Sequence, residues 1–156
     1  MRAIYLLTAF LIFPVFAHCQ GIFERYGLTY DANGELIDGR YIQSSEDDQL
    51  TKVYHYNKGL LEGDFLVYNS DGDLVEKGKY HDGQKHGKWM TWEADGIRTC
   101  KVHFNYGQRD GKWEIHDSKG TLRYVMFYNI GKKVGVWQVF DEKGVLQEER
   151  KLTRTI

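Results

Sequence analysis

The sequence predicts an all-β protein in which repeated antiparallel β-hairpins, with a 24-residue period, form one elongated, twisted sheet. Glycine recurs three times per unit without any change in spacing, and the large aromatic residues recur with the same period. The repeating glycines are Gly59, Gly63 and Gly72; Gly83, Gly87 and Gly96; Gly107, Gly111 and Gly120; and Gly131, Gly135 and Gly144. Such self-similarity indicates an array whose units bury their apolar faces against their neighbours.

Each unit is expected to contain two strands, because apolar and polar side chains alternate along it. In the third unit, Trp113 and Ile115 share one parity, whereas Lys112 and Glu114 share the other. The second strand of a unit alternates in the same way, and one parity is expected to face the core. The residues expected to face the core are Leu122, Tyr124, Met126 and Tyr128 in the third unit and Arg98, Cys100, Val102 and Phe104 in the second.

Columns of large side chains define the predicted core. The core residues of the repeats are Phe65, Trp89, Trp113, Trp137, Tyr80, Phe104 and Tyr128. A further column has the opposite parity and consists of Tyr68, Trp92, His116 and Phe140. Either a bulge turns this column into the core or it forms an exposed aromatic ladder; the first is favoured, because tryptophan and phenylalanine are usually buried.

Two turns close each unit. Segments such as Ser70-Asp71-Gly72 suit a type I turn that ends in a left-handed glycine, where a β-carbon would clash. The second turn of each unit carries pairs such as Asp82-Gly83, and here too the glycine marks a positive φ. About nine or ten strands are expected in total.

A degenerate unit precedes the four regular ones. Gly39, Tyr41 and Tyr56 each lie one period before a glycine or aromatic residue of the first regular unit. The acidic stretch 46–48 stands where the turn glycine would be. A terminal capping repeat needs a polar outer side, so this unit is interpreted as a cap.

The stretches 80–92 (YHDGQKHGKWMTW), 104–116 (FNYGQRDGKWEIH) and 128–140 (YNIGKKVGVWQVF) resemble the Y-x-x-G-x-x-x-G-x-W-x-x-Y unit of MORN-repeat variants, in particular a bacterial YwqK-like group of antitoxin components. The resemblance covers roughly residues 35–152. It implies an elongated hairpin sheet, no known catalytic residues, and protein binding or scaffolding; related repeats have also been proposed to contact membranes. Departures include Phe65 in place of tryptophan and His116 in place of the expected aromatic residue.

The N-terminus predicts export. Arg2 precedes an apolar run that ends at Phe16, followed by Ala17-His18-Cys19, which is typical of a signal peptide cleaved near Cys19/Gln20. The run is shorter than the roughly 20 residues that a membrane-spanning helix needs. Lipidation of Cys19 is the alternative, and only then is membrane association expected. The domains are thus a signal peptide (1–19), N-terminal strands with the degenerate capping repeat (20–58) and four MORN-like β-hairpin repeats (59–156).

Composition and motifs argue against several functions. The chain of 156 residues has a formal net charge of −1, which disfavours non-specific nucleic-acid binding. Removal of the signal peptide leaves Cys100 as the one cysteine, expected to be buried and unreactive. No pair of histidines has the spacing of a zinc site, and no serine or cysteine lies in a nucleophile motif, so no metal, cofactor or enzymatic activity is expected.

Two surfaces are candidates for binding. The outer face of the second strands is expected to present Val75, Thr99 and Val125 together with a short basic stripe: Lys77, Lys79, Lys101, His103 and Arg123. The second candidate is the aromatic column that contains Trp92 and Phe140. Solvation that protects the sheet from association would explain the lysines without any partner.

The function expected from these features is that of a non-enzymatic exported protein that binds or scaffolds another protein. The family resemblance implies an antitoxin-like or immunity-like role. Export from the cytosol conflicts with neutralisation of a toxin inside the cell. The alternative is a carbohydrate-binding or cell-envelope-binding module that stacks sugars on the aromatic ladder. An enzyme is the least favoured class.

Overall fold

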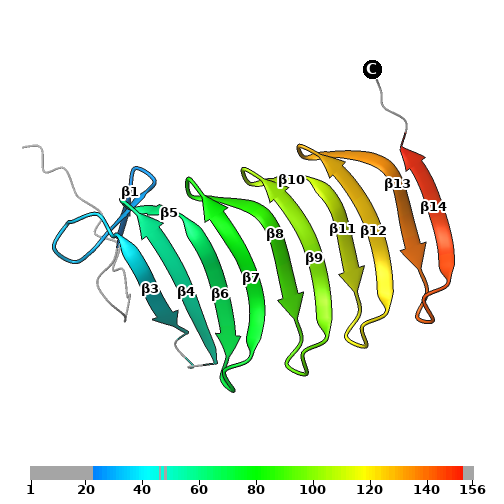
Figure 1. Cartoon of the computed structure of the whole chain (residues 1–156), viewed down its shortest axis with the longest axis horizontal. Coiled ribbons are helices and arrows are strands. Elements are labelled where there is room, and N and C mark those ends of the chain that lie inside the picture. The colour runs from blue at the N-terminus through cyan, green and yellow to red at the C-terminus, as the bar shows by residue number, and fades with distance from the viewer. Residues whose placement is uncertain (1–22, 46, 48, 153–156) are drawn as a thin grey trace, which may run out of the picture.

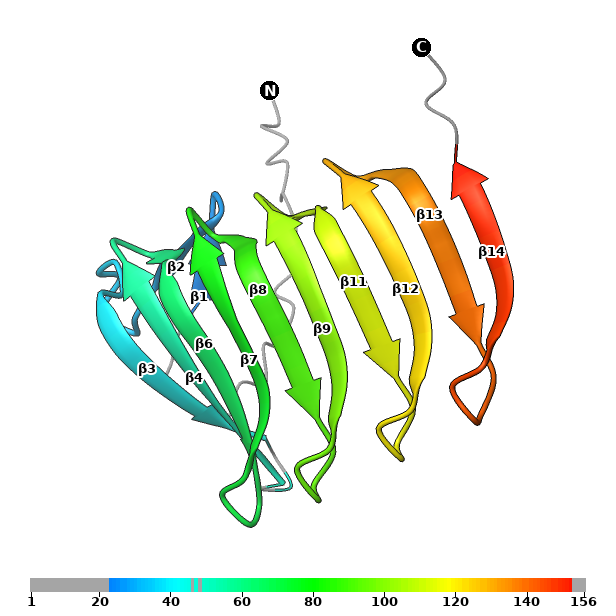
Figure 2. The same ribbon diagram turned by 45° about the vertical axis from the view of Figure 1, so that its right-hand side comes forward.

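The computed structural model describes residues 23–45, 47 and 49–152, and every regular element in that part of the chain is a β-strand. Antiparallel pairing joins these strands into a long, twisted and gently curved sheet (Figures 1 and 2). The predicted fold class, an all-β array of hairpins, is confirmed. The predicted signal peptide lies outside the described residues.

The main sheet follows the chain from one edge to the other. Its path runs through β3 (Gly39–Ser44), β4 (Leu50–Asn57), β6 (Gly63–Asn69), β7 (Leu74–His81), β8 (Gln84–Trp92), β9 (Arg98–Asn105), β11 (Gly111–His116), β12 (Leu122–Asn129), β13 (Lys132–Phe140) and β14 (Leu146–Leu152). Two short strands, β5 (Leu60–Leu61) and β10 (Gln108–Arg109), pair with β4 and β9. β1 (Phe23–Arg25) and β2 (Leu28–Tyr30) form a separate hairpin beside β4 and β5.

All five hairpins have the same register. The first glycine of each hairpin pairs with the aromatic or aliphatic residue near the end of its second strand: Gly39 with Tyr56, Gly63 with Tyr80, Gly87 with Phe104, Gly111 with Tyr128 and Gly135 with Leu152. The degenerate unit therefore folds like the others. It differs in its far turn, where Ser45 N–H donates to the Leu50 carbonyl across a longer loop.

The turns between units, at the upper edge in Figure 1, are two-residue turns with positive φ at both central positions. The glycine was expected there, but the residue before it is also left-handed, as with Ile130 at φ 45°. This conformation defines the type I′ turn, whose twist matches that of paired strands. Gly131 N–H donates to the Arg109 carbonyl of the preceding repeat at 2.7 Å, and equivalent bonds recur along the edge.

A side chain from the preceding repeat accepts a hydrogen bond from each of these turns. The side chain of Asp38 accepts from Lys58 N–H (3.4 Å), that of Glu62 from Asp82 N–H (2.9 Å), that of His86 from Tyr106 N–H (3.5 Å) and that of Asp110 from Ile130 N–H (3.1 Å). The residues that accept are thus also spaced by one period. Their role in fastening one repeat to the next was not predicted from the sequence.

The turns within units, at the lower edge, contain a side-chain acceptor. Asp141 Oδ1 accepts from the N–H groups of Lys143 and Val145, both at 2.9 Å. Asn69 and Asp117 make the equivalent pairs of bonds. These side chains hold the backbone in the turn while Gly144 and its equivalents adopt the left-handed conformation that was expected of them.

One face of the sheet carries a core without a second layer among the described residues. Phe65, Val67, Trp89 and Val102 form its most buried cluster, and Trp89 is 2 % exposed. The Trp89 ring packs directly on Gly78, where a β-carbon would lie 2.2 Å from the ring. Cross-strand packing of aromatic side chains therefore takes the place of sheet-on-sheet packing.

The N-terminal end is closed by the segment between β2 and β3. Ile37, 5 % exposed, donates its N–H to the Thr29 carbonyl, and Gly59 N–H donates to the Ile37 carbonyl. Thr29 N–H in turn donates to the Gly59 carbonyl. This segment covers the turn between β4 and β5 and occupies the place that a preceding repeat would take.

Candidate binding surfaces

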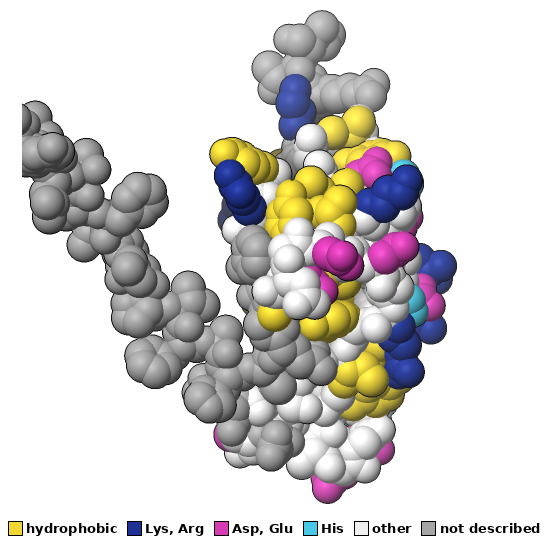
Figure 3. Space-filling model, turned by 90° about the vertical axis from the view of Figure 1, so that its left-hand side faces the viewer, with side chains coloured by type: hydrophobic (Ala, Val, Ile, Leu, Met, Phe, Trp, Pro, Cys, Tyr) yellow, Lys and Arg dark blue, Asp and Glu magenta, His cyan; other side chains and the backbone are white. Residues whose placement is uncertain are grey.

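The sheet has two faces of different character. The aromatic face is defined by Tyr54, Phe65, Tyr80, Trp89, Phe104, Trp113, Tyr128 and Trp137. The charged face is defined by Lys77, Lys79, Lys88, Lys101, His103, Lys112 and Glu114, which the register places on the opposite side. Seen end-on, charged side chains of both signs gather along one flank of the molecule (Figure 3).

Rings on the aromatic face form a continuous chain of contacts. Neighbouring centroids lie 5.2 to 6.2 Å apart from Tyr54 through to Trp137, and each of these pairs is edge-on or tilted. Such geometries are favourable for aromatic pairs. Cys100 lies half-buried beside this core, and burial raises the pKa of its thiol. A thiol of that kind is a poor nucleophile.

A cation lies over the rings in three of the four regular units, and Leu61 takes its position in the first. Lys85 Nζ is 3.7 Å from the centroid of a Trp89 ring, Arg109 Cζ is 4.6 Å from that of Tyr128, and Lys133 Nζ is 4.4 Å from that of Trp137. Arg109 also donates a hydrogen bond to the Tyr128 hydroxyl at 3.1 Å. Cation–π attraction and the aliphatic stems shield the aromatic residues from water.

The C-terminal end of the aromatic face is less covered. Tyr124 is 43 % exposed, and a shallow pocket of about 270 Å³ opens beside it. The pocket is lined by Tyr124, Met126, Trp137, Gln138, Val139, Glu148 and Arg150. Its floor is apolar, while the carboxylate of Glu148 and the guanidinium of Arg150 supply polar groups at β14.

The predicted basic stripe is interleaved with carboxylates. Lys79 pairs with Asp64 at 3.5 Å, and Lys101 pairs with Glu114 at 3.6 Å. His103 Nδ1 is 3.8 Å from a carboxylate oxygen of Asp110. Of the predicted stripe residues on this face, only Lys77 has no carboxylate within ion-pair distance among the described residues. Glu114 also accepts from Lys112 at 2.7 Å, a bond that lowers the pKa of its carboxyl.

Arg123 does not join this stripe. Its Nε donates to the Phe140 carbonyl at 3.0 Å, and an Nη lies 3.4 Å from Asp117 Oδ2. Val75 and Thr99, which occupy the position of Arg123 in the two preceding units, are the extra residues of β-bulges, so the predicted alternation fails there.

Val75 packs against the core cluster, and Thr99 hydrogen-bonds to Thr91 across the aromatic face. The expectation that Val75 and Thr99 lie on the outer face is therefore wrong.

The aromatic column with Trp92 and Phe140 stays outside the core. Bulges lie opposite it in each regular unit, but the extra residue belongs to the partner strand. Trp92 and Phe140 are half-buried and take part in no ring contact with the other described residues. The favoured expectation, that a bulge turns this column into the core, is wrong, because the bulge reorients Val75 and its equivalents instead.

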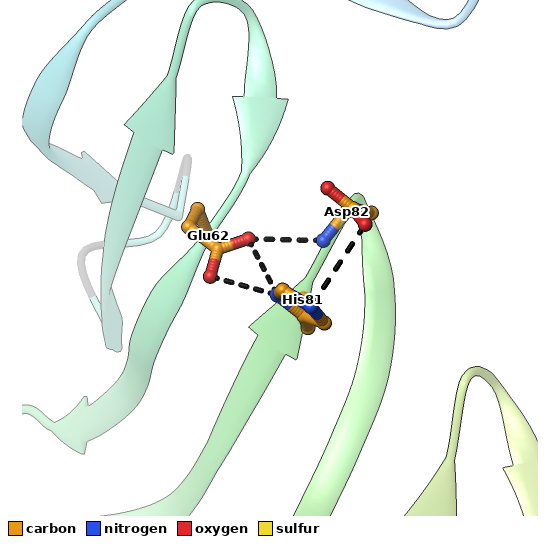
Figure 4. A group of neighbouring side chains, drawn as sticks. All are labelled: Glu62, His81 and Asp82. Atoms are coloured by element: carbon orange, nitrogen blue, oxygen red, sulfur yellow. Dashed lines mark hydrogen bonds and ion pairs between the residues drawn. The ribbon is translucent and has the colours of Figure 1, made fainter.

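A third group lies on the upper edge (Figure 4). The Glu62 carboxylate oxygens are 3.0 and 3.1 Å from His81 Nδ1, and His81 Nε2 is 3.9 Å from Asp82 Oδ2. Hydrogen bonding to Glu62 raises the pKa of His81, whereas the N–H of Asp82, followed by His81, lowers the pKa of Glu62. Sequence spacing gave no sign of this group, because the β6–β7 hairpin brings Glu62, at its start, beside His81 and Asp82, at its end.

The family model of the MORN repeat variant matches residues 133–151, which span most of β13 and β14. The match supports a MORN-repeat protein, since these residues are one copy of a unit that recurs in the same register from Gly39 onward. MORN repeats are generally modules that bind proteins or lipids. No curated protein matches the chain. Within residues 23–152, apart from 46 and 48, no helix is long and apolar enough to cross a membrane.

Proposed function

We propose that this protein is a non-enzymatic binding protein whose C-terminal aromatic surface engages another protein. The surface consists of Tyr124, Met126, Trp137 and Val139 on β12 and β13, with Glu148 and Arg150 at its rim. The observation that carries the proposal is the pocket these residues line, next to a tyrosine that is 43 % exposed. Half-exposed aromatic residues surrounded by polar groups are typical of the energetic centres of protein interfaces.

The charged face supports the proposal less well. Most of its predicted stripe residues already have a carboxylate nearby, so their charges are largely compensated. Exposed pairs of this kind contribute little energy and suit a solvated surface. The type of repeat is consistent with binding across several strands, since a sheet offers an extended surface and few deep pockets.

The location and the pathway are also proposals. The apolar N-terminal segment that ends near Cys19 favours export to the periplasm, the cell envelope or the exterior. An antitoxin-like or immunity-like role would follow the resemblance to the YwqK-like group, with an exported toxin as the partner. The sequence contains no nucleophile motif or zinc-site spacing, which favours binding over turnover.

A carbohydrate is the second candidate ligand, and the same pocket favours it. Trp137 and Tyr124 offer ring faces, and the paired side chains of Glu148 and Arg150 offer hydrogen-bonding groups beside them. Sugars bind proteins through this combination of stacking and polar contacts. Neither Trp92 nor Phe140 lines the pocket beside Tyr124, so the exposed-ladder alternative does not share this support.

The test is capture of envelope components by the immobilised protein, compared between two charge substitutions. Tyr124→Glu places a charge in the aromatic surface at an exposed position, so the fold should persist and capture should be lost. Lys77→Glu makes a matched change on the charged face and should leave capture unchanged. Loss of capture with Lys77→Glu and retention with Tyr124→Glu would contradict the proposal. Release by added oligosaccharide would identify a carbohydrate ligand in place of a protein.

A further inference from the structure

The group at the upper edge of the sheet joins an imidazole to two carboxylates, one before the β6–β7 hairpin and one after it (Figure 4). Glu62 precedes β6, His81 ends β7, and Asp82 is the first residue of the following turn. One potential ligand atom from each residue lies within 4.8 Å of the other two. Together these side chains offer one nitrogen donor and two oxygen donors.

The repeat itself shows which of these residues the fold requires. Glu62 caps the next turn, and Asp38 and Asp110 do the same in other repeats, so its turn contact has a structural explanation. His81 and Asp82 have no such explanation. At the position of His81 the other units carry Asn57, Asn105 and Asn129, and at the position of Asp82 they carry Lys58, Tyr106 and Ile130. These turns adopt the same backbone without an imidazole or a carboxylate.

The hydrogen bonds define the donor atoms. An ionised carboxylate can only accept, so the contacts of 3.0 and 3.1 Å with Glu62 require the proton on Nδ1 of His81. In the neutral ring Nε2 then carries a lone pair, and it faces Asp82 Oδ2 at 3.9 Å. A metal ion with bonds of about 2.0–2.2 Å to nitrogen and oxygen fits between two such atoms with a small rotation of Asp82.

The neighbourhood restrains the imidazole. The Tyr106 ring contacts both His81, at 5.4 Å between centroids, and His86, at 4.9 Å. His86 directs its Nδ1 at the Tyr106 N–H, so its Nε2 carries the proton in the neutral ring and is not a donor to a metal. A carboxylate that holds Nδ1 while Nε2 binds the ion is the usual second-shell arrangement around histidine ligands.

We propose that Glu62, His81 and Asp82 form a surface site for a divalent transition-metal ion of the Zn²⁺ class. His81 Nε2 and the Asp82 carboxylate are the direct ligands, Glu62 orients the ring, and water completes the coordination. Imidazole favours Zn²⁺, Ni²⁺ or Cu²⁺ over Mg²⁺ and Ca²⁺, which prefer sites made of oxygen alone. Both ligand side chains are substantially exposed, so the site binds and releases its ion readily.

The test is calorimetric titration of the metal-free full chain with ZnCl₂ at neutral pH. One ion per chain is expected, and MgCl₂ should give no binding heat. His81→Asn and Asp82→Lys install residues that other repeats carry at these positions, so both variants should fold and bind Zn²⁺ about 10-fold or more weakly.

His103→Asn is the matched control, because His103 also lies beside a carboxylate, at 3.8 Å from Asp110. It should leave the affinity for Zn²⁺ unchanged. The proposal would be overturned by the absence of binding at one ion per chain, or by an equal loss of affinity in His103→Asn and His81→Asn. Neither result bears on the aromatic surface, so the two proposals fail separately.

Discussion

The Trp113 indole donates a hydrogen bond from Nε1 to the carbonyl oxygen of His103 on the neighbouring strand at 3.0 Å. Asp110 N–H donates to the same oxygen at 2.9 Å, where the chain bulges before Gly111. Trp89 and Trp137 make the equivalent bonds to Lys79 and Phe127, both at 3.2 Å. Tryptophan therefore fills the core and also donates to a carbonyl at the irregular point of each of these three repeats. Phe65, in the first regular unit, lacks the donor.

The first prediction separates these two roles of Trp113. Trp113→Ala removes a large, partly buried side chain and should cost about 3–5 kcal/mol. Trp113→Phe keeps most of the packing, as Phe65 does in its own unit, and should cost about 1 kcal/mol for the lost hydrogen bond in addition to a small volume term. The measurement is the free energy of unfolding in denaturant. Equal costs for the two variants would mean that packing contributes little at this position.

The fold was predictable because glycine and aromatic residues repeat at fixed spacing, and that spacing sets both register and turn type. Sequence parity failed where a bulge breaks the alternation, as at Val75, because a local extra residue leaves no mark in a fixed 24-residue period. The site was harder to predict. Glu62 meets His81 across 19 residues, and Tyr124 borders a pocket that side chains of β13 and β14 complete.

The second prediction concerns the strained turn at Ile130. A β-branched residue at φ 45° is disfavoured, and this side chain is 53 % exposed, so it gains little from burial. Ile130→Asn should stabilise the protein by about 1 kcal/mol, measured as a rise in the free energy of unfolding. Ile42→Asn is the control, because Ile42 is similarly exposed (46 %) but lies within β3. Stabilisation by the control as well would show that strain is not the cause.

The third prediction concerns the stability of the fold at low pH. The N–H of Val145 is the largest influence on the pKa of Asp141 and lowers it; desolvation opposes this, and the N–H of Lys143 adds to it. A carboxyl whose pKa is lower in the folded state stabilises the fold above its unfolded pKa, near 3.8, and that stability is lost as pH falls through the folded value. The melting temperature should therefore fall below about pH 4.

Asp141→Asn provides the control for this acid effect. Asn69 makes the same two backbone bonds in its own turn, so the amide preserves the turn but does not titrate. The variant should lose less stability than the parent protein between pH 5 and pH 2, within the range where carboxyls titrate. An unchanged pH profile would mean that Asp141 is not one of the groups responsible.

The fourth prediction concerns Gly78. A methyl group there would lie 2.2 Å from the Trp89 ring, which is 2 % exposed and cannot move freely. Gly78→Ala should therefore destabilise the protein by about 1–3 kcal/mol through overpacking. In the double variant Gly78→Ala/Trp89→Phe, the smaller ring should accommodate the methyl group. A double-mutant cycle with no coupling between the two sites would contradict the contact.

The most direct test of the binding account is hydroxyl-radical footprinting of the protein alone and with its captured partner. Tyr124, Met126 and Trp137 are oxidisable side chains on the aromatic surface, and Met90 and Trp92 are oxidisable side chains that belong to the opposite side of the sheet. Partner binding should lower the oxidation of Tyr124, Met126 and Trp137 and leave that of Met90 and Trp92 unchanged. Protection of Met90 and Trp92 with no change at Tyr124, Met126 and Trp137 would contradict the binding account.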